Sequence, residues 1–367
     1  MKMTPRERIF AALRLQEVDR PPLMLWGLDP YLPPYDPSYK PLLDYIRENV
    51  EIKRRWSPSG GGLFFSAAKV EIISGSKTEN GITARESTIK TPKGDLNAIS
   101  RSVPGTFASA EIKRYISSQE DIEKFLSLPY EPIKTDVSSF FNVYNELGER
   151  GVVTFRTSDP MGVVGGIYDP EEFVLACVLQ KDIVKKMLDA MFERIFAYYK
   201  SILEGGARPI FIIQGPEYIS PPLLPPEYFD DLVVEHDRKL VRLIHDYGCH
   251  VIIHCHGNMN AIIEKFIEIG TDGLHPVESP PLGDIALADA KHRIGDRICI
   301  VGNIQIGDMF DCSADEIAEK CRQLIKDGGK NGLIIAITAT PYEKPLSERT
   351  FQNYIRLIET GKQYRAL

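Results

Sequence analysis

The sequence predicts a closed (β/α)8 TIM barrel with a small antiparallel β insertion near its N-terminus. From residue 150 onward, short apolar runs alternate with helical patterns, which is typical of βαβ units around a parallel sheet. No G-x-G-x-x-G follows any of these runs, which favours a barrel over an open dinucleotide-binding sheet. The 367 residues exceed the roughly 250 that such a barrel needs. We therefore expect residues 1–367 to form a single barrel domain.

The N-terminal part of the chain predicts a helix, a strand and a second helix. Thr4-Pro5-Arg6-Glu7 combines a capping box with a proline at the first helical position, so a helix is expected to begin here. Arg20-Pro21-Pro22 ends any helix. The apolar run at 23–27 then predicts a first buried strand, and a proline-rich loop leads to a helix over 42–56.

Residues 63–102 predict the insertion. Asn80-Gly81 is a strong hairpin signal, and Pro92-Lys93-Gly94 is a second turn signal. The segments around these turns have partly alternating polarity, which is typical of half-buried strands. We expect a small antiparallel meander here.

Six further apolar runs predict the strands of the barrel. They lie at 151–155, 209–213, 251–256, 273–277, 298–301 and 333–337. The helical patterns that separate or follow them lie at 170–204, 226–246, 259–269, 285–294, 314–327 and 348–360. Together with the run at 23–27 this makes seven strands, and a strand near 162–168 would complete the eight.

Composition and charge exclude several classes of protein. The formal net charge of −7, without any Lys/Arg-rich run, argues against a nucleic-acid binder. The 6 cysteines form no C-x-x-C motif, which favours reduced thiols in a cytosol. The N-terminus lacks the apolar core of a signal peptide, and no apolar stretch approaches the roughly 20 residues of a membrane span. We expect a soluble cytoplasmic protein with enough chain for a large core.

The run from His250 to Asn258 is the strongest candidate for a site. Side chains alternate faces along a strand, so His254 and His256 share one face and Cys255 points to the other. Two imidazoles where a strand meets its loop direct nitrogen atoms toward one point. The alternative is that these are hydrogen-bonded core residues, because local spacing supplies no third metal ligand.

Polar side chains also follow the other predicted strands, where the active site of a barrel lies. These residues are Trp26, Asp29, Arg156, Asp159, Gln214, Glu217, Asn258, Glu278, Asn303, Gln305, Thr338, Thr340 and Tyr342. Each has a structural alternative: Asp159 and Asp29 precede prolines and can shape turns, and Asn303 follows a glycine. His275 is interpreted as structural.

Two carboxylates and two imidazoles from different strands permit two chemistries. They could hold a divalent metal and leave room for water or substrate. They could instead divide acid and base roles without a metal, with carboxyl pKa values tuned by burial. The residues leave both alternatives open.

Several motifs also carry a family resemblance over nearly the whole length. They are Met3-Thr4-Pro5-Arg6-Glu7-Arg8, Asp19-Arg20-Pro21-Pro22, Thr91-Pro92-Lys93-Gly94, His254-Cys255-His256-Gly257-Asn258, Gly270-Thr271-Asp272-Gly273 and Gly302-Asn303-Ile304. The chain resembles the uroporphyrinogen decarboxylase superfamily, and more closely its corrinoid-dependent methyltransferase-like and uncharacterised branches. The resemblance implies a barrel, a site at its C-terminal mouth and a homodimer.

The chain departs from both reactions of that superfamily. Authentic uroporphyrinogen decarboxylases place arginines after the first strand, whereas this chain has no Arg or Lys between Arg20 and Lys40. That absence argues against a polycarboxylate substrate. The corrinoid-linked methyltransferases carry an H-x-C zinc motif with a later cysteine. His254 keeps the first position, His256 replaces the cysteine, and no cysteine lies near Thr338.

The resemblance leads to a functional hypothesis. The chain is expected to transfer a methyl group from a small O- or N-methylated donor to a corrinoid on a partner protein. His254, His256 and a carboxylate, Glu278 or Glu217, would bind zinc, and the other carboxylate or Asp159 would act as general acid. The expected substrate-binding residues are Trp26, Tyr31, Arg156, Gln214, Asn258, Asn303 and Tyr342.

Two other functions stay open. One is a carboxy-lyase that acts on a tetrapyrrole or a small organic acid, with Arg156 as the cation that meets a substrate carboxylate. The other is a non-catalytic module that binds a corrinoid or tetrapyrrole.

Overall fold

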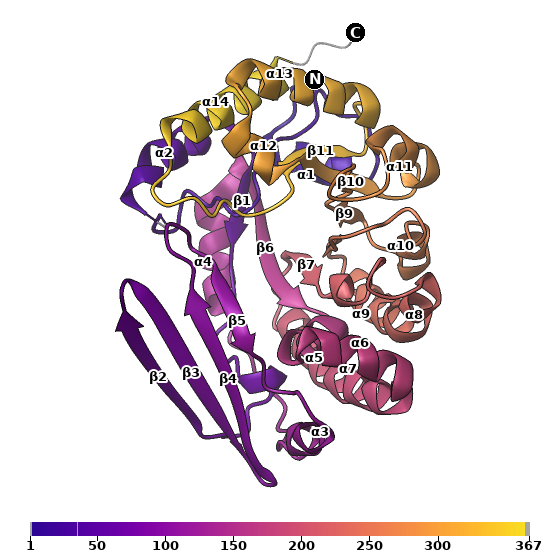
Figure 1. Ribbon diagram of the computed structural model, residues 1–367. Coiled ribbons are helices and arrows are strands. Elements are labelled where there is room, and N and C mark those ends of the chain that lie inside the picture. The colour runs from indigo at the N-terminus through magenta and orange to yellow at the C-terminus, as the bar shows by residue number, and fades with distance from the viewer. Residues whose placement is uncertain (1, 35, 364–367) are drawn as a thin grey trace.

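The computed structural model describes residues 2–34 and 36–363 and contains two separate sheets (Figure 1). The larger is a curled sheet of seven parallel strands in the order β1-β6-β7-β8-β9-β10-β11. Its strands are β1 (Ile52–Arg55), β6 (Gly151–Ser158), β7 (Ile210–Gln214), β8 (Val251–His254), β9 (Gly273–His275), β10 (Cys299–Ile304) and β11 (Leu333–Ile337). The strand runs predicted from residue 151 onward are confirmed.

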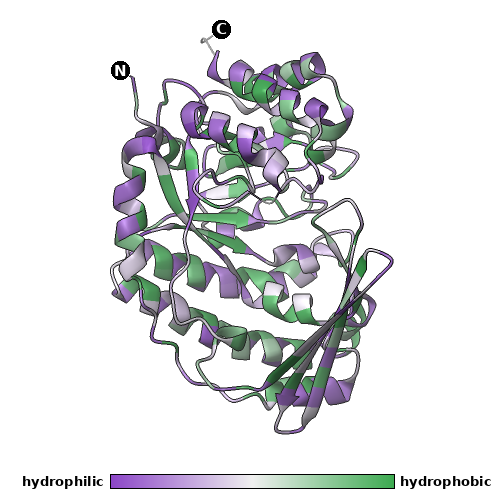
Figure 2. Cartoon of the chain, turned by 90° about the vertical axis from the view of Figure 1, so that its left-hand side faces the viewer, coloured by the Kyte–Doolittle hydropathy of each residue, from purple (hydrophilic) through white to green (hydrophobic). Residues whose placement is uncertain are grey.

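Helices cover the outer face of this sheet (Figure 1). They are α1 (Pro5–Leu13), α2 (Lys40–Asn49), α4 (Ser138–Leu147), α5 (Pro160–Ile167), α6 (Pro170–Leu179), α7 (Lys181–Glu204), α8 (Pro226–Phe229), α9 (Glu235–Asp246), α10 (Lys265–Ile269), α11 (Leu287–Ile294), α12 (Ile306–Asp311), α13 (Ala314–Gly328) and α14 (Glu348–Lys362). The helix α3 (Gln119–Leu126) packs instead against the smaller sheet. Figure 2 shows apolar strands enclosed by helices of mixed polarity. None of the described helices combines the length and apolarity needed to cross a bilayer.

The predicted strand at 23–27 is present only as a single bridging residue. Leu23 pairs in parallel with Ile335 of β11, and Met24 N donates to Ile335 O at 2.9 Å. On its other side, Leu23 O accepts from the backbone N–H of Glu51 at 3.2 Å, directly before β1. The pairing ends early because Gly27 turns the chain with a φ of 76°. This segment therefore hydrogen-bonds to both ends of the curled sheet.

Two predicted elements are wrong: one predicted strand is a helix, and one strand of the sheet lies inside a predicted helix. The predicted strand at 162–168 is instead part of α5, which Asp159 caps by accepting from Gly162 N at 2.5 Å. Proline at the first helical position and this cap outweigh the β-branched residues. The missing strand is β1, which lies inside the helix predicted over 42–56. Its sequence, Ile-Lys-Arg-Arg, lacks the apolar run typical of a buried strand.

The smaller sheet confirms and extends the predicted meander. Its antiparallel order is β2-β3-β4-β5, with β2 (Ile72–Glu79), β3 (Ile82–Thr91), β4 (Gly94–Ser102) and β5 (Ser109–Lys113). Asn80 and Gly81 form the first turn with positive φ angles of 50° and 77°. The fourth strand, β5, lies beyond residue 102 and was not predicted.

Glu51 ties the N-terminal segment to β1. Its side chain is 1% exposed and accepts hydrogen bonds from Arg8 Nη1 at 2.5 Å, Arg20 Nη2 at 2.7 Å and Leu23 N at 2.8 Å. Arg8 is itself buried and also pairs with Asp19 at 2.6 Å. A buried network of this kind is stable only while each charge keeps its partner.

Candidate functional site

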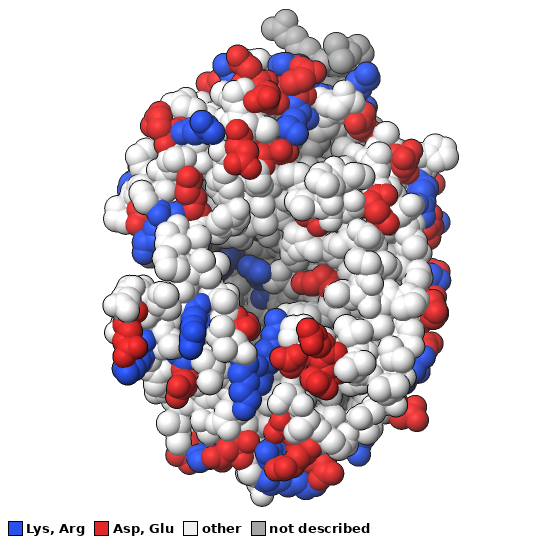
Figure 3. Space-filling model, viewed as in Figure 1, with Lys and Arg blue, Asp and Glu red and all other residues white. Residues whose placement is uncertain are grey.

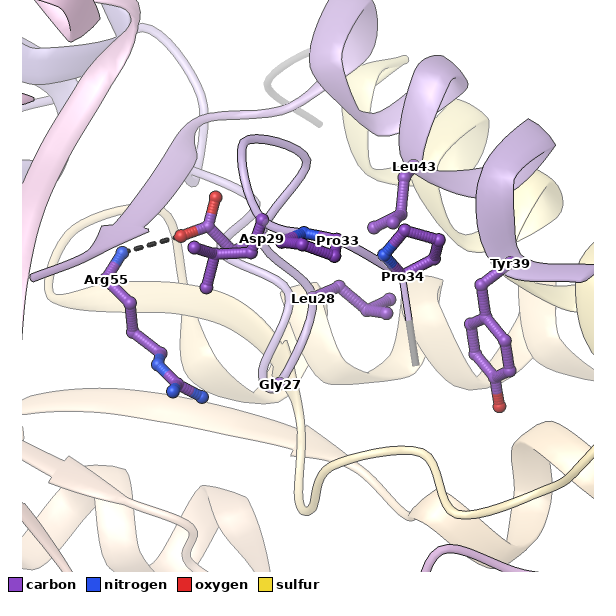
Figure 4. A pocket seen from close by; sticks show the side chains of 9 residues that line it. Gly27, Leu28, Asp29, Pro33, Pro34, Tyr39, Leu43 and Arg55 are labelled. Carbon is purple, nitrogen blue, oxygen red and sulfur yellow. Dashed lines mark hydrogen bonds between the residues drawn. The ribbon is translucent and has the colours of Figure 1, made fainter. Parts of the chain in front are cut away.

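A pocket opens at the C-terminal ends of the strands. One part is lined by the loop after Leu23, by α2 and by Arg55 of β1 (Figure 4). It shares Gly27, Leu28, Asp29 and Arg55 with a deeper part, whose other lining residues are Trp26, Lys53, Thr154, Arg156, Ile212 and Thr340. Figure 3 shows a hollow near the centre of this face with Lys or Arg atoms at its base.

His254 and His275 form a hydrogen-bonded pair whose tautomers can be deduced. His275 Nε2 lies 3.0 Å from Ile337 O, and a carbonyl can only accept, so Nε2 carries the hydrogen. Burial holds the pKa of both histidines well below the ordinary value, so both rings are neutral. His275 Nδ1 must therefore accept the 2.8 Å hydrogen bond from Nδ1 of His254. This leaves a lone pair on His254 Nε2.

His256 is oriented by Glu278. Its Nδ1 donates to Glu278 Oε2 at 2.9 Å, while its ring meets that of His254 at a centroid distance of 4.7 Å. The Glu278 side chain is 8% exposed, whereas that of His256 is 36% exposed. A buried carboxylate behind a solvent-accessible imidazole is the arrangement that prepares a histidine for proton transfer.

Glu217 lies beside this pair, in the short 3-10 helix Pro216–Tyr218 after β7. Its Oε2 accepts from Gly215 N at 2.9 Å. Burial raises the pKa of Glu217, although nearby His256 and Arg156 oppose the shift. A carboxyl group that keeps its proton to higher pH is suited to act as a general acid.

Asp159 is less accessible than the sequence interpretation required. It has no exposed surface, caps α5, and lies against Asp237 of α9. Its Oδ2 and both carboxyl oxygens of Asp237 are buried without a hydrogen-bond donor among the described residues. Two adjacent anions here would be unfavourable, so the pair keeps a proton. Burial raises the pKa of Asp237 to about 8, and Asp159 does not face the pocket.

We expect Asp237→Asn to stabilise the protein increasingly between pH 5 and pH 8. The raised folded-state pKa means that the unfolded chain releases this proton first, so wild-type stability falls as pH rises, by at most about 1.4 kcal/mol per pH unit. Thermal unfolding midpoints of both proteins, measured across this range, would show the difference widening. A constant difference would contradict the shared proton.

Trp26 connects the histidines to a buried lysine. Its ring stacks on that of His275 at a centroid distance of 3.6 Å, and Lys53 Nζ lies 3.7 Å from the centroid of the Trp26 ring. Burial first, and then the charges of Arg156 and Arg55, lower the pKa of Lys53 to about 7. Arg156 itself donates from Nε to Gln214 Oε1.

Other predicted binding residues lie outside this arrangement. Tyr31 packs beneath the guanidinium groups of Arg47 and Arg54. Tyr342 is 42% exposed and packs on Phe310. Asn303 donates from Nδ2 to Val277 O, and the backbone N–H of Asn258 donates to Pro221 O. None of these four lines the two pocket parts described above.

The metal site expected at His254, His256 and Glu278 is not assembled. Among residues 2–34 and 36–363, no group of three or more His, Cys, Asp and Glu side chains is arranged to hold a metal ion. Glu278 is bonded to His256 Nδ1, and His254 Nδ1 is bonded to His275. The Glu278 carboxylate is thus engaged by the His256 ring, and the three expected donors do not converge on one point.

Comparison with known families identifies this chain. Residues 108–340 match the uroporphyrinogen decarboxylase (URO-D) family. This range includes β6 to β11 and the histidines His254, His256 and His275. The chain belongs to the URO-D family. No curated protein matches the sequence significantly.

One solved structure shares the fold of this URO-D-family chain. A methyltransferase from Methanosarcina mazei matches with a TM-score of 0.62 and 15% identity, covering 97% of this chain and 98% of that chain. A B12-independent methionine synthase from a Shewanella species gives a TM-score of 0.42 at 13% identity, covering 63% and 68%. A putative vitamin-B12-independent methionine synthase from Listeria monocytogenes gives 0.39 at 14%, covering 63% and 71%. The first match establishes a shared fold, and the other two add nothing to it.

The URO-D-family site contains residues that sequence reasoning missed. Lys53 and Arg55 were assigned to a helix, and His275 was interpreted only as structural. The segment between Arg20 and Lys40 contains no cation, but β1 brings one to it: Arg54 lies 3.4 Å from the Asp29 carboxylate. One feature of the sequence could have indicated β1. The apolar spacing typical of a helix stops after Val50, and Lys53 and Arg55 then stand two residues apart, as residues on one face of a strand do.

Proposed function

We propose that this URO-D-family chain is an enzyme that removes a methyl group from a small O- or N-methylated donor and passes it to a corrinoid on a partner protein. The observation that carries the proposal is the placement of Glu217 beside the His256–Glu278 pair at the mouth of the sheet. The fold shared with a methyltransferase is compatible with this activity.

The side chains provide the proton that such a reaction needs. When the bond between a methyl carbon and a donor oxygen breaks, the oxygen retains the bonding electrons and must be protonated. Glu217, with its raised pKa, gives this proton to the leaving oxygen. His256 then returns a proton from solvent to Glu217, because it is the more exposed member of the pair. Glu278 holds its ring in place.

His254 has a different part in this proposal. Its neutral ring has an unprotonated Nε2, fixed by the hydrogen bonds through His275 to Ile337 O. This atom can accept a hydrogen bond from the donor molecule and position it.

We also infer that the curled sheet is a closed (β/α)8 barrel. The backbone hydrogen bonds of Pro22, Leu23 and Met24 to β11 and to Glu51 support closure through this segment. On this view residues 1–367 are a single domain and the antiparallel sheet is its insertion.

The test is anaerobic incubation of the purified chain with cob(I)alamin and a panel of methoxylated aromatic compounds and methylamines. We expect methylcobalamin to form, followed by its absorbance, with at least one donor and only when the chain is present. Failure across the panel, with correctly folded protein, would count against methyl transfer.

A second candidate is a carboxy-lyase for a small organic acid. It is favoured by the cations Lys53, Arg55 and Arg156 around one pocket, since they would meet a substrate carboxylate. A carboxy-lyase would release the substrate carboxylate as CO2, whereas a methyltransferase would leave it on the product. Release of labelled CO2 from a carboxyl-labelled acid would support the lyase, and retention of the label would support the methyltransferase.

A further inference from the structure

Three cations surround the deeper part of the mouth pocket. Lys53 and Arg55 are two residues apart on β1, so they share one face of that strand. Arg55 is in register with Thr154 of β6, and Arg156 follows on the same face of β6. All four residues line the pocket, together with Trp26.

The one acidic residue that lines this pocket is already occupied. Asp29 accepts from Arg55 N at 2.7 Å (Figure 4) and from Tyr31 N at 2.9 Å, and it pairs with Arg54 at 3.4 Å. Among the described residues, Asp29 therefore forms its ion pair with Arg54 and not with Lys53 or Arg55. Within the described part of the chain, no carboxylate lies within 4.0 Å of the side-chain nitrogen atoms of Lys53 or Arg55. These two side chains therefore bring positive charge to the pocket without an acidic partner there.

Lys53 makes this accumulation unusual, because its side chain is buried. The residue is 8% exposed, and its ammonium group lies over the face of the Trp26 ring. Burying an ammonium group without a paired anion is unfavourable, and proteins rarely keep such a group without a use for it.

We propose that Lys53, Arg55 and Arg156 bind the carboxylate of the substrate, so that the methyl donor is a small methylated organic acid. The substrate class rests on the proposed function, whereas the anion site does not. The carboxylate would lie over Lys53, between the guanidinium groups of Arg55 and Arg156.

The position of Arg156 links this site to the proton donor. Its charge lowers the pKa of Lys53 and opposes the burial-driven rise in the pKa of Glu217. Arg156 therefore couples the anion site electrostatically to the proposed proton donor. Trp26 and Ile212 supply apolar walls to the pocket that holds the three cations.

Binding at this site must be coupled to a proton. The pKa of Lys53 is about 7, owing to burial and to Arg156 and Arg55, with Asp29 as the opposing charge. The other titratable groups that face it are His254 and His275, which are neutral. A bound carboxylate favours the ammonium form, so Lys53 takes up a proton when the ligand binds above neutral pH.

The test is calorimetric titration with benzoate and with benzamide, its neutral isostere, in buffers of different ionisation enthalpy. We expect benzoate to bind at least about tenfold more tightly, with uptake of about 0.8 proton at pH 8 and about 0.1 at pH 6. Lys53→Met should weaken benzoate binding about tenfold or more and abolish the uptake. Lys53→Arg should bind benzoate without uptake, because arginine is always charged.

Lys200→Met, an exposed substitution on α7, is the matched control and should behave like wild type. Equal affinity for benzoate and benzamide, or proton uptake that persists in Lys53→Met, would overturn the anion site. Selective, proton-coupled binding without methyl transfer in the cobalamin assay would remove only the proposed function. Methyl transfer without charge selectivity would remove only this inference.

Discussion

Replacing Glu217 with glutamine is expected to lower the rate of methyl transfer by about 10²–10⁴-fold, the usual contribution of a positioned general acid. The amide keeps the shape of the side chain and can still accept from Gly215 N, so the loop should be preserved. What it lacks is the proton that the leaving oxygen requires. The rate of methylcobalamin formation at saturating donor measures this loss.

The pH profile provides a second readout for Glu217. Because burial raises the pKa of this acid, wild-type activity should persist above the ordinary glutamate range and fall as pH rises through the raised value. The variant should lose that limb of the profile. Glu204→Gln, at the exposed end of α7, is the control. A Glu217→Gln rate within a factor of two of wild type would assign the proton to another group.

Replacing Glu51 with alanine is expected to produce the largest loss of stability, about 3–5 kcal/mol. The substitution leaves the buried guanidinium of Arg8 with one fewer partner and deprives Leu23 N of its acceptor. Thermal unfolding should begin at a markedly lower temperature, with the N-terminal segment detached from β1. Calorimetry, with hydrogen exchange at Leu23 and Met24, would measure both effects.

Two comparisons make the Glu51 prediction specific. Glu48→Ala changes a carboxylate of α2 that forms no ion pair with another described residue, so it should have little effect. Combining Arg8→Met with Glu51→Leu removes both charges and should recover part of the loss, because no uncompensated charge remains. A double variant less stable than Glu51→Ala would show that the charges themselves are required.

Much of the fold could be predicted from sequence because its main signal is strong. Strands β7, β8 and β11 are buried on both faces and read as continuous apolar runs. β1 could not be found in this way, because it projects Lys53 and Arg55 into the mouth of the sheet. A strand that builds a site lacks the apolar pattern by which strands are recognised. The helix α5 was missed because its capping residue, Asp159, precedes the apolar run at 162–168 that was interpreted as a strand.

The proximity of His254 and His256 could be predicted from sequence, but their hydrogen-bond partners could not. Sequence spacing placed His254 and His256 near one another, and the structure brings their rings together. It could not reveal that Glu278 would bond to His256, or that His275 would bond to His254, because those pairs depend on the register of β8 against β9. One-dimensional patterns do not contain such cross-strand partners.

The hydrogen-bond chain from Ile337 O through His275 to His254 has a consequence for molecular recognition. Its direction is set by a carbonyl that cannot donate, so the chain can run only one way. The last atom, His254 Nε2, is thereby committed to receiving a hydrogen. A bound molecule is therefore stabilised when it directs an O–H or N–H at His254 Nε2, whereas an ether oxygen is better placed toward the protonated carboxyl group of Glu217.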